Sequence, residues 1–156
     1  MSLLADISPV APEDYPRVVE VWEASVRATH HFVAESDIEI FRPLVFDELP
    51  HTDLACVRDV NGMVAGFIGI AEGKVEMLFI HPDYREQGIG RTLLSYAIHE
   101  RGATTVDVNE QNDQALGFYL RMGFEVVGRS ELDSNGKPYP LLHMRLASVV
   151  TSPSKC

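Results

Sequence analysis

The sequence predicts a mixed α/β domain with a mostly antiparallel central sheet and about four flanking helices. In several segments apolar residues recur every three or four positions, which is typical of helices with one buried face. Between them lie short apolar runs joined by tight turns such as Asn61-Gly62, which is typical of β-hairpins. A chain of 156 residues, 46% of them hydrophobic, is long enough for one such core and short for two.

The N-terminal part is predicted to hold an edge strand and two helices. Residues 6–10 form the strand, because Pro9 lacks an N–H and is tolerated only at the edge of a sheet. Helical spacing of apolar residues then runs from Pro12 to about residue 30. A second helix is expected over 36–48, with Pro43 in its first turn or kinking it.

Three antiparallel strands are predicted next, at 54–58, 63–71 and 75–80. The later helices are marked by their ends, because Gly102 and Gly123 follow helical stripes and Asn112 precedes one. We expect one domain over residues 1–147 and a polar tail at 148–156. The remaining elements are a helix over 89–101, a strand over 104–108, a helix from 113 to 122, and strands over 124–132 and 140–147.

Composition excludes several classes of protein. The chain lacks a run of apolar residues long enough for a membrane span, and its first residues do not resemble a signal peptide. A net charge of −10 disfavours nucleic acid and anionic membranes but attracts a cationic amine. Cys56 and Cys156 do not form a disulfide framework, and the six histidines lack the spacing of metal ligands. We therefore expect a cytoplasmic protein without a metal ion.

The run Arg85-Glu86-Gln87-Gly88-Ile89-Gly90-Arg91 lies between a predicted strand and a predicted helix. Its glycines leave backbone N–H groups uncovered at the start of the helix, and such an arrangement binds anions. A nucleoside triphosphate loop would require Gly-x-x-x-x-Gly-Lys, which is missing. A dinucleotide fingerprint would require glycine where Leu93 stands. The loop thus points to an anionic group of another kind, with a simple tight turn as the alternative.

Together with its surroundings, this run resembles the GNAT superfamily of N-acetyltransferases. Before it stands Leu78-Phe79-Ile80-His81-Pro82-Asp83-Tyr84, and after it comes Asn112-Asp113-Gln114-Ala115-Leu116-Gly117-Phe118-Tyr119-Leu120-Arg121-Met122-Gly123-Phe124. The resemblance covers essentially the whole chain. The runs Ser25-Val26-Arg27-Ala28-Thr29-His30, Asn109-Glu110-Gln111-Asn112 and Gly136-Lys137-Pro138-Tyr139-Pro140-Leu141-Leu142 are similar to the YjaB-like branch of bacterial acetyltransferases.

The resemblance implies a GNAT-like fold in which one strand pair is parallel and splayed, and it implies acetyl-CoA as cosubstrate. Glu86 departs from the family pattern, since many relatives carry glycine there, and its carboxylate would stand beside the expected phosphates. Arg85 and Arg91 are the nearest cations able to offset it. The residues expected to bind the cofactor are Leu78, Phe79, Ile80, Arg85, Glu86, Gln87, Gly88, Ile89, Gly90, Arg91, Asn112, Ala115, Phe118 and Tyr119.

The family further implies roles in catalysis and acceptor binding. Tyr119 lies one helical turn beyond Ala115 and is the expected general acid, which protonates the leaving thiolate. Glu76 is the first candidate for the base that deprotonates the acceptor amine, with an ordinary charge near a strand end as the alternative. The residues expected to form the acceptor pocket are Trp22, Ser25, Thr29, His30, Phe32 and Tyr139. The alternative is that they pack in the core, as for Trp22, or lie in a solvated loop, as for His30.

The leading hypothesis is direct transfer of an acetyl group from acetyl-CoA to a primary amine of a small molecule, peptide or protein. A covalent route through Cys56 lacks an evident histidine partner in the sequence. The alternatives are a non-catalytic acyl-CoA sensor and an acyltransferase for longer chains. Either a monomer or a homodimer is compatible with the sequence, because Phe32, Phe41 and Phe46 can pack inside the protein or between subunits.

Overall fold

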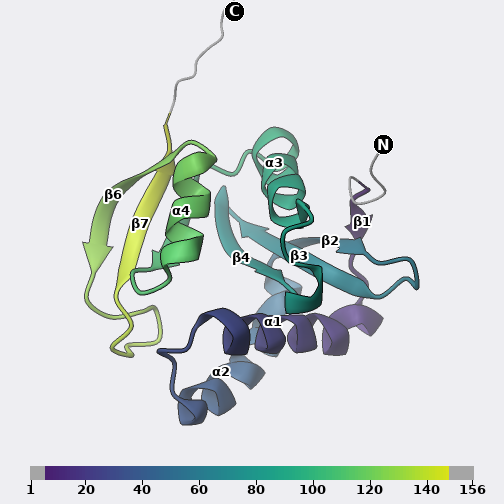
Figure 1. Cartoon of the computed structure of the whole chain (residues 1–156), viewed down its shortest axis with the longest axis horizontal. Coiled ribbons are helices and arrows are strands. Elements are labelled where there is room, and N and C mark those ends of the chain that lie inside the picture. Colours follow the sequence, from purple (N-terminus) through teal and green to yellow (C-terminus); the bar gives the residue numbers. More distant parts are fainter. Residues whose placement is uncertain (1–5, 148–156) are drawn as a thin grey trace, which may run out of the picture. The chain divides into compact units, whose positions relative to one another are not determined.

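The computed structural model of the chain describes residues 6–147, so the tail predicted at 148–156 lies outside the described residues. The elements fall into two compact units, one ending at Ala103 and the other beginning at Thr104 (Figure 1). The prediction that 1–147 form a single domain stays a prediction. No helix within residues 6–147 is both long and apolar enough to cross a membrane.

The first unit contains each helix and strand predicted for residues 6–103, with small shifts of their ends. The edge strand is shorter than expected, and the second helix begins one residue earlier and continues through Pro43, which lies in its interior and not in its first turn. The elements are β1 (Ser8–Pro9), α1 (Tyr15–Thr29), α2 (Glu35–Glu48), β2 (Asp53–Arg58), β3 (Val64–Ala71), β4 (Lys74–Ile80) and α3 (Ile89–Arg101), with 3₁₀ turns at Pro12–Asp14, Leu49–His51 and Pro82–Tyr84.

Within this unit, β1, β2, β3 and β4 pair antiparallel in that order. Pro9 lies in the edge strand β1, as its missing N–H requires. The turn between β3 and β4 is formed by Glu72 and Gly73, whose φ angles are 53° and 79°. Two positive φ angles in succession match the right-handed twist of a hairpin, and glycine adopts them without strain.

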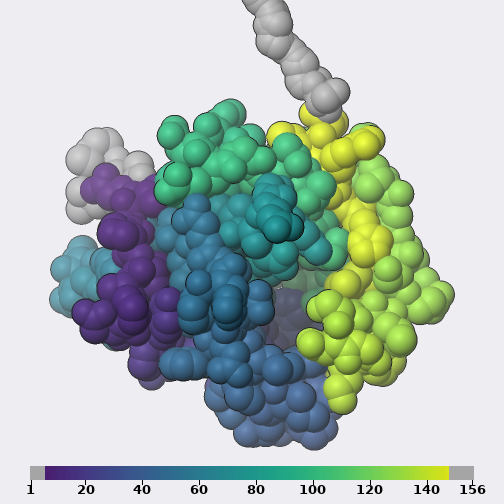
Figure 2. Space-filling model, turned by 180° about the vertical axis from the view of Figure 1, so that it is seen from behind, coloured from purple at the N-terminus to yellow at the C-terminus, as the bar shows by residue number. Residues whose placement is uncertain are grey.

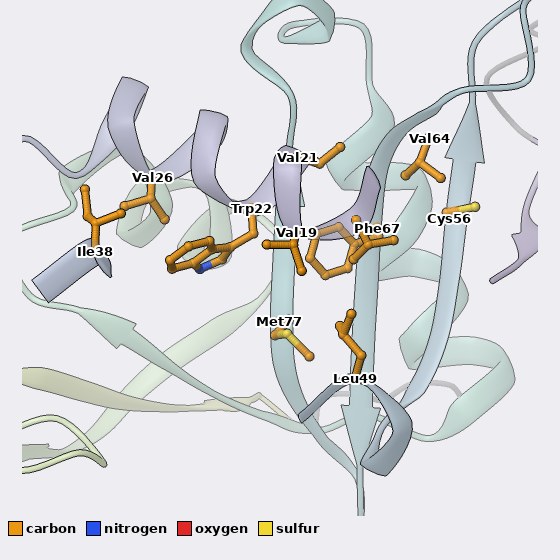
Figure 3. Close-up of a cluster of buried hydrophobic side chains, with 11 residues drawn as sticks. Val19, Val21, Trp22, Val26, Ile38, Leu49, Cys56, Val64, Phe67 and Met77 are labelled. Carbon is orange, nitrogen blue, oxygen red and sulfur yellow. The ribbon is translucent and has the colours of Figure 1, made fainter. Parts of the chain in front are cut away.

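The central strand β3 is covered on both faces, because all its residues from Val64 to Ile70 are buried. Phe67 points into a hydrophobic cluster with Val18 and Trp22 of α1 (Figure 3). Its neighbour Gly66 points to the other face, where an added Cβ would lie 2.9 Å from Cγ2 of Ile89 in α3. Helices α1 and α3 therefore pack on opposite faces of this sheet, while α2, drawn in blue, lies at the surface (Figure 2).

The second unit is a three-stranded antiparallel sheet with one helix. Its elements are β5 (Thr105–Asn109), α4 (Asp113–Arg121), β6 (Phe124–Ser130) and β7 (Leu141–Leu146), and β7 lies between β5 and β6. The last two strands are shorter than predicted. Tyr119 of α4 contacts Phe124 with ring centroids 5.5 Å apart, so α4 covers the sheet face that carries Phe124. The connection from β6 to β7, coloured yellow-green, lies at the surface (Figure 2).

Phe67 should contribute far more to stability than a phenylalanine at the surface. Its side chain is fully buried, whereas that of Phe46 in α2 is 44% exposed. Replacement of Phe67 by alanine leaves a cavity, and we expect the free energy of unfolding to fall by about 3–5 kcal/mol. Phe46→Ala is the matched control and should cost less than about 1 kcal/mol. Urea unfolding measures both, and equal losses would contradict this description of the core.

Candidate functional site

The glycine-rich run forms an exposed loop that leads directly into α3. Residues 85–88 are exposed, whereas Ile89, the first residue of the helix, is 1% exposed and packs against the sheet beside Gly66. The contact of Ile89 with the core thus holds the end of the loop that joins α3. The residues of the loop that precede Ile89 are open to solvent. This arrangement fixes the direction of the first turn of α3.

The first turn of α3 presents amide hydrogens without acceptors inside the helix. The first intrahelical bond runs from the Thr92 N–H to the Gly88 carbonyl oxygen at 3.0 Å, so the amides of Ile89, Gly90 and Arg91 precede the hydrogen-bonded ladder. Gly88 is the N-cap residue with φ of 82°, and it has no side chain to cover these amides. Amides without an acceptor and the positive end of the helix dipole are together able to bind an anion such as a phosphate.

Glu86 adopts a left-handed backbone conformation, with φ of 64°. This conformation is strained for residues that have a Cβ and unstrained for glycine. The structure thus gives a physical reason for the glycine expected at this place. The carboxylate of Glu86 is exposed and stands two residues before the N-cap of α3.

Tyr84 anchors the loop from the side of β4. Its hydroxyl donates a hydrogen bond of 2.6 Å to the Asp59 carboxylate in the β2–β3 turn. Asp59 also accepts hydrogen bonds from the N–H groups of Asn61 and Met63, so the turn is rigidly closed. The bond raises the pKa of the Tyr84 phenol and lowers that of the Asp59 carboxyl. Sequence reasoning missed this contact, since nothing in either segment marks two residues 25 positions apart as partners.

Strand β4 carries four of the expected site residues. Leu78, Phe79 and Ile80 are partly buried at its end, and the Phe79 ring lies 5.9 Å from that of Phe67. Glu76 is exposed and stands at a β-bulge, because the pairing with β3 passes from Val75 directly to Met77. Bulges redirect a side chain and occur next to active sites. The bulge at Glu76 was not predicted from the sequence.

At the end of α1, four of the expected acceptor residues lie together. The Thr29 hydroxyl donates to the Ser25 carbonyl oxygen at 2.7 Å and lies 2.8 Å from Nδ1 of His30. The His30 ring is 5.3 Å from that of Phe32. Burial, together with the charge of neighbouring His31, lowers the pKa of His30 to about 4, so its imidazole is neutral at physiological pH. Trp22, the fifth, is 5% exposed and belongs to the core cluster of Figure 3.

In the second unit, α4 arranges the remaining expected cofactor residues. Oδ1 of Asn112 accepts a hydrogen bond from the Ala115 N–H at 3.1 Å, so the predicted N-cap is confirmed. Tyr119 is 6% exposed and lies between the rings of Phe118 and Phe124, at 5.1 and 5.5 Å. None of the described residues of this unit accepts a hydrogen bond from its hydroxyl. Burial raises the pKa of the phenol, which therefore keeps its proton at physiological pH.

Tyr139, the sixth expected acceptor residue, is 8% exposed and precedes β7. The expected site residues of the first unit thus lie on the loop, at the end of β4 and at the end of α1. Those of the second unit are the residues on and before α4, together with Tyr139. Within residues 6–147, no three histidine, cysteine or carboxylate side chains come together in the way a metal ion requires.

Comparison with known proteins places this chain in a family. Residues 47–147 match the family described as the acetyltransferase (GNAT) domain. The peptidyl-lysine N-acetyltransferase YjaB of Salmonella typhimurium is 44% identical over 133 residues, which cover 85% of this chain and 91% of the relative. The solution structure of apo-YjaB from Escherichia coli is 38% identical and has a TM-score of 0.83, covering 90% of this chain and 96% of that one.

The chain belongs to the GNAT family of acetyltransferases. The mixed α/β GNAT-like fold expected from the sequence and the likeness to the YjaB-like branch are both confirmed. A second solved structure, an N-acetyltransferase from Thermoplasma acidophilum in complex with coenzyme A, shares the fold at 22% identity and a TM-score of 0.68. The protein is accordingly an N-acetyltransferase with acetyl-CoA as acyl donor, and the comparisons do not support the alternative of a non-catalytic sensor.

Replacement of Glu86 by glycine should strengthen the binding of coenzyme A. The change removes a negative charge beside the helix N-terminus and relieves the left-handed backbone. We expect the Kd, measured by calorimetry, to fall about two- to tenfold. Glu86→Gln separates the two causes, because it removes the charge but keeps the Cβ. A gain in both variants assigns the effect to charge, and an unchanged or higher Kd in both would contradict the placement of phosphate at this loop.

Proposed function

We propose that the protein acetylates lysine side chains of peptides or proteins, with the diphosphate of acetyl-CoA held by the amides at the start of α3. The observation that carries the proposal is the uncovered first turn of α3 in a chain of the GNAT family. The acceptor class is supported by the peptidyl-lysine N-acetyltransferase at 44% identity. The net charge of −10 favours a cationic acceptor of this kind.

The loop residues from Arg85 to Arg91 and the end of β4 are proposed to hold the donor. The exposed guanidinium of Arg91 stands next to the uncovered amides and adds a planar set of donors suited to phosphate. Leu78, Phe79 and Ile80 offer backbone and apolar surface to the pantetheine arm. The other residues proposed to bind the donor belong to the second unit. They are Asn112, which precedes α4, and Ala115 and Phe118, which lie on it.

Tyr119 is proposed as the general acid of the transfer. The amine nitrogen attacks the acetyl carbon, a C–N bond forms, the C–S bond breaks, and Tyr119 gives its proton to the leaving sulfur, while the proton released from the acylated nitrogen restores the phenol. Its burial and the lack of an acceptor for its hydroxyl within the second unit support this role, since the hydroxyl is protonated and ready to donate. The reaction needs no covalent enzyme intermediate, and burial raises the pKa of the Cys56 thiol, which makes it a poor nucleophile.

Before it attacks, the acceptor ammonium must lose a proton. Glu76 is proposed as the base, because it is the exposed residue at the β-bulge of β4 and lies between the buried residues Val75 and Met77. The acceptor pocket is proposed to include Ser25, Thr29, His30 and Phe32 at the end of α1. Trp22 supports that end from the core, and Tyr139 contributes from the second unit.

The charge and the sequence support further parts of this proposal. The acidic balance argues against nucleic acid or an anionic membrane as partner, and we place the enzyme in the cytoplasm. A monomer or a homodimer can carry out the reaction, since every proposed step uses residues of one chain.

Tyr119→Phe should slow catalysis and leave donor binding intact. Loss of the proton donor is expected to lower kcat about 100- to 10,000-fold, while the Kd for acetyl-CoA changes less than about twofold. Tyr96→Phe on α3 is the matched control and should retain wild-type activity. Release of free thiol measures kcat, and calorimetry measures binding. A Tyr119→Phe enzyme with full activity would remove this residue from the mechanism.

The acceptor class can be tested with two peptides that differ only at one side chain. A peptide with a blocked N-terminus and one lysine should be acetylated on Nζ, whereas the same peptide with arginine should not react. Because attraction to the acidic protein is electrostatic, kcat/KM for the lysine peptide should fall as salt is raised. Mass spectrometry locates the acetyl group. Turnover of free small amines alone, with none on the peptide, would contradict a peptidyl-lysine acceptor.

A further inference from the structure

Three polar residues of the second unit form a hydrogen-bonded chain that the acetyl-transfer reaction does not use. Oγ of Ser130 lies 2.7 Å from Nε2 of His143, and Nδ1 of His143 lies 2.6 Å from Oδ1 of Asp107. The three residues come from β6, β7 and β5, which are neighbours in the sheet. Serine, histidine and carboxylate are connected here in the order that activates a serine for nucleophilic attack.

Strand pairing brings the three side chains to one face of the sheet. Asp107 and His143 are direct partners on neighbouring strands, so they point to the same side. Met144, the next residue of β7, is buried and points to the opposite side. Phe124 pairs with Leu146 and contacts α4 through Tyr119, so α4 covers the Met144 side. The hydrogen-bonded chain therefore lies on the sheet face that is opposite α4.

A β-bulge in β6 is what places Ser130 on this face. Val126 pairs with Met144, and after an irregularity Gly128 pairs with His143 and Ser130 with Leu141. In a regular strand Val127 would stand opposite His143, and Ser130 would point to the other side of the sheet. Gly128 lies directly beside the imidazole, because an added Cβ would be in van der Waals contact with Cδ2 of His143 at 3.4 Å. The extra residue in β6 thus places the Ser130 hydroxyl on the same face of the sheet as His143.

The hydrogen-bond roles follow from the chemistry of the groups. An ionised carboxylate only accepts, so Nδ1 of His143 carries the hydrogen and donates to Asp107. Nε2 is then the acceptor and takes the hydroxyl hydrogen of Ser130. The His143 side chain is 36% exposed and that of Asp107 is 24% exposed, while Ser130 is half-buried. A small molecule in solution can therefore reach the site.

We propose that Ser130, His143 and Asp107 form a second nucleophilic site, in which Oγ of Ser130 takes an acyl group from small activated carboxylic esters. Oγ attacks the carbonyl carbon and an Oγ–C bond forms while its proton passes to Nε2 of His143. The bond from this carbon to the leaving oxygen breaks, and His143 returns the proton to that oxygen. Asp107 stays ionised and stabilises the imidazolium that forms in between.

The test uses p-nitrophenyl acetate with the full-length protein. We expect a burst of p-nitrophenol and one acetyl group on Ser130, located by mass spectrometry of peptides. Ser134, an exposed serine of the β6–β7 connection, is the internal reference. Ser130 should react at least about 100-fold faster than Ser134. Equal labelling of both serines, or none on Ser130, would overturn the proposal.

Matched variants separate this site from a purely structural network and from acetyl transfer to amines. Ser130→Ala should abolish the burst, and Asp107→Asn should slow it at least about tenfold while the protein stays folded by circular dichroism. Ser134→Ala should leave it unchanged. The assay contains no acetyl-CoA, so the result of the burst experiment does not depend on the proposed acetyltransferase mechanism. An unchanged burst rate in Asp107→Asn would show that the histidine does not activate Ser130.

Discussion

The first turn of α3 is the constraint on which the proposed site depends. Its amides cannot be satisfied inside the helix, and Gly88 offers no side chain to cap them. Gly90 is partly exposed and Arg91 is exposed, so amides of this turn can accept an anion from solvent, whereas a side-chain cap would have closed the turn. The core contact of Ile89 with β3 and the bond from Tyr84 to Asp59 hold the two sides of the loop. The position of the amides is therefore set by packing on one side and by a turn on the other.

Irregular strand pairing is the second structural feature that positions reactive side chains in this chain. A bulge turns Glu76 out of β4, and another turns Ser130 toward His143. In both cases one extra residue interrupts the regular pairing and changes which side chains share a face with the partner strand. The same sheet can thereby keep its core side apolar and present reactive groups elsewhere.

Local rules allowed much of the fold to be predicted from the sequence. Gly102 ends α3 and Asn112 caps α4 because these roles depend on one residue and its immediate neighbours. Features that depend on pairing at a distance could not be predicted: the bulges in β4 and β6, the Tyr84–Asp59 bond and the chain from Ser130 to Asp107. Helical spacing also could not separate Trp22, which lies in the core, from Thr29, which lies partly exposed at the end of the same helix.

The central claim is that the start of α3 holds a diphosphate, and a pair of ligands tests it most directly. Coenzyme A and pantetheine share the thiol arm, but only coenzyme A carries the diphosphate and its nucleotide. Several charge-assisted hydrogen bonds of about 1.5–3 kcal/mol each should make pantetheine bind at least about 100-fold more weakly in calorimetric titrations of the folded protein. Equal affinity for both ligands, or no heat with coenzyme A at millimolar concentration, would contradict the account.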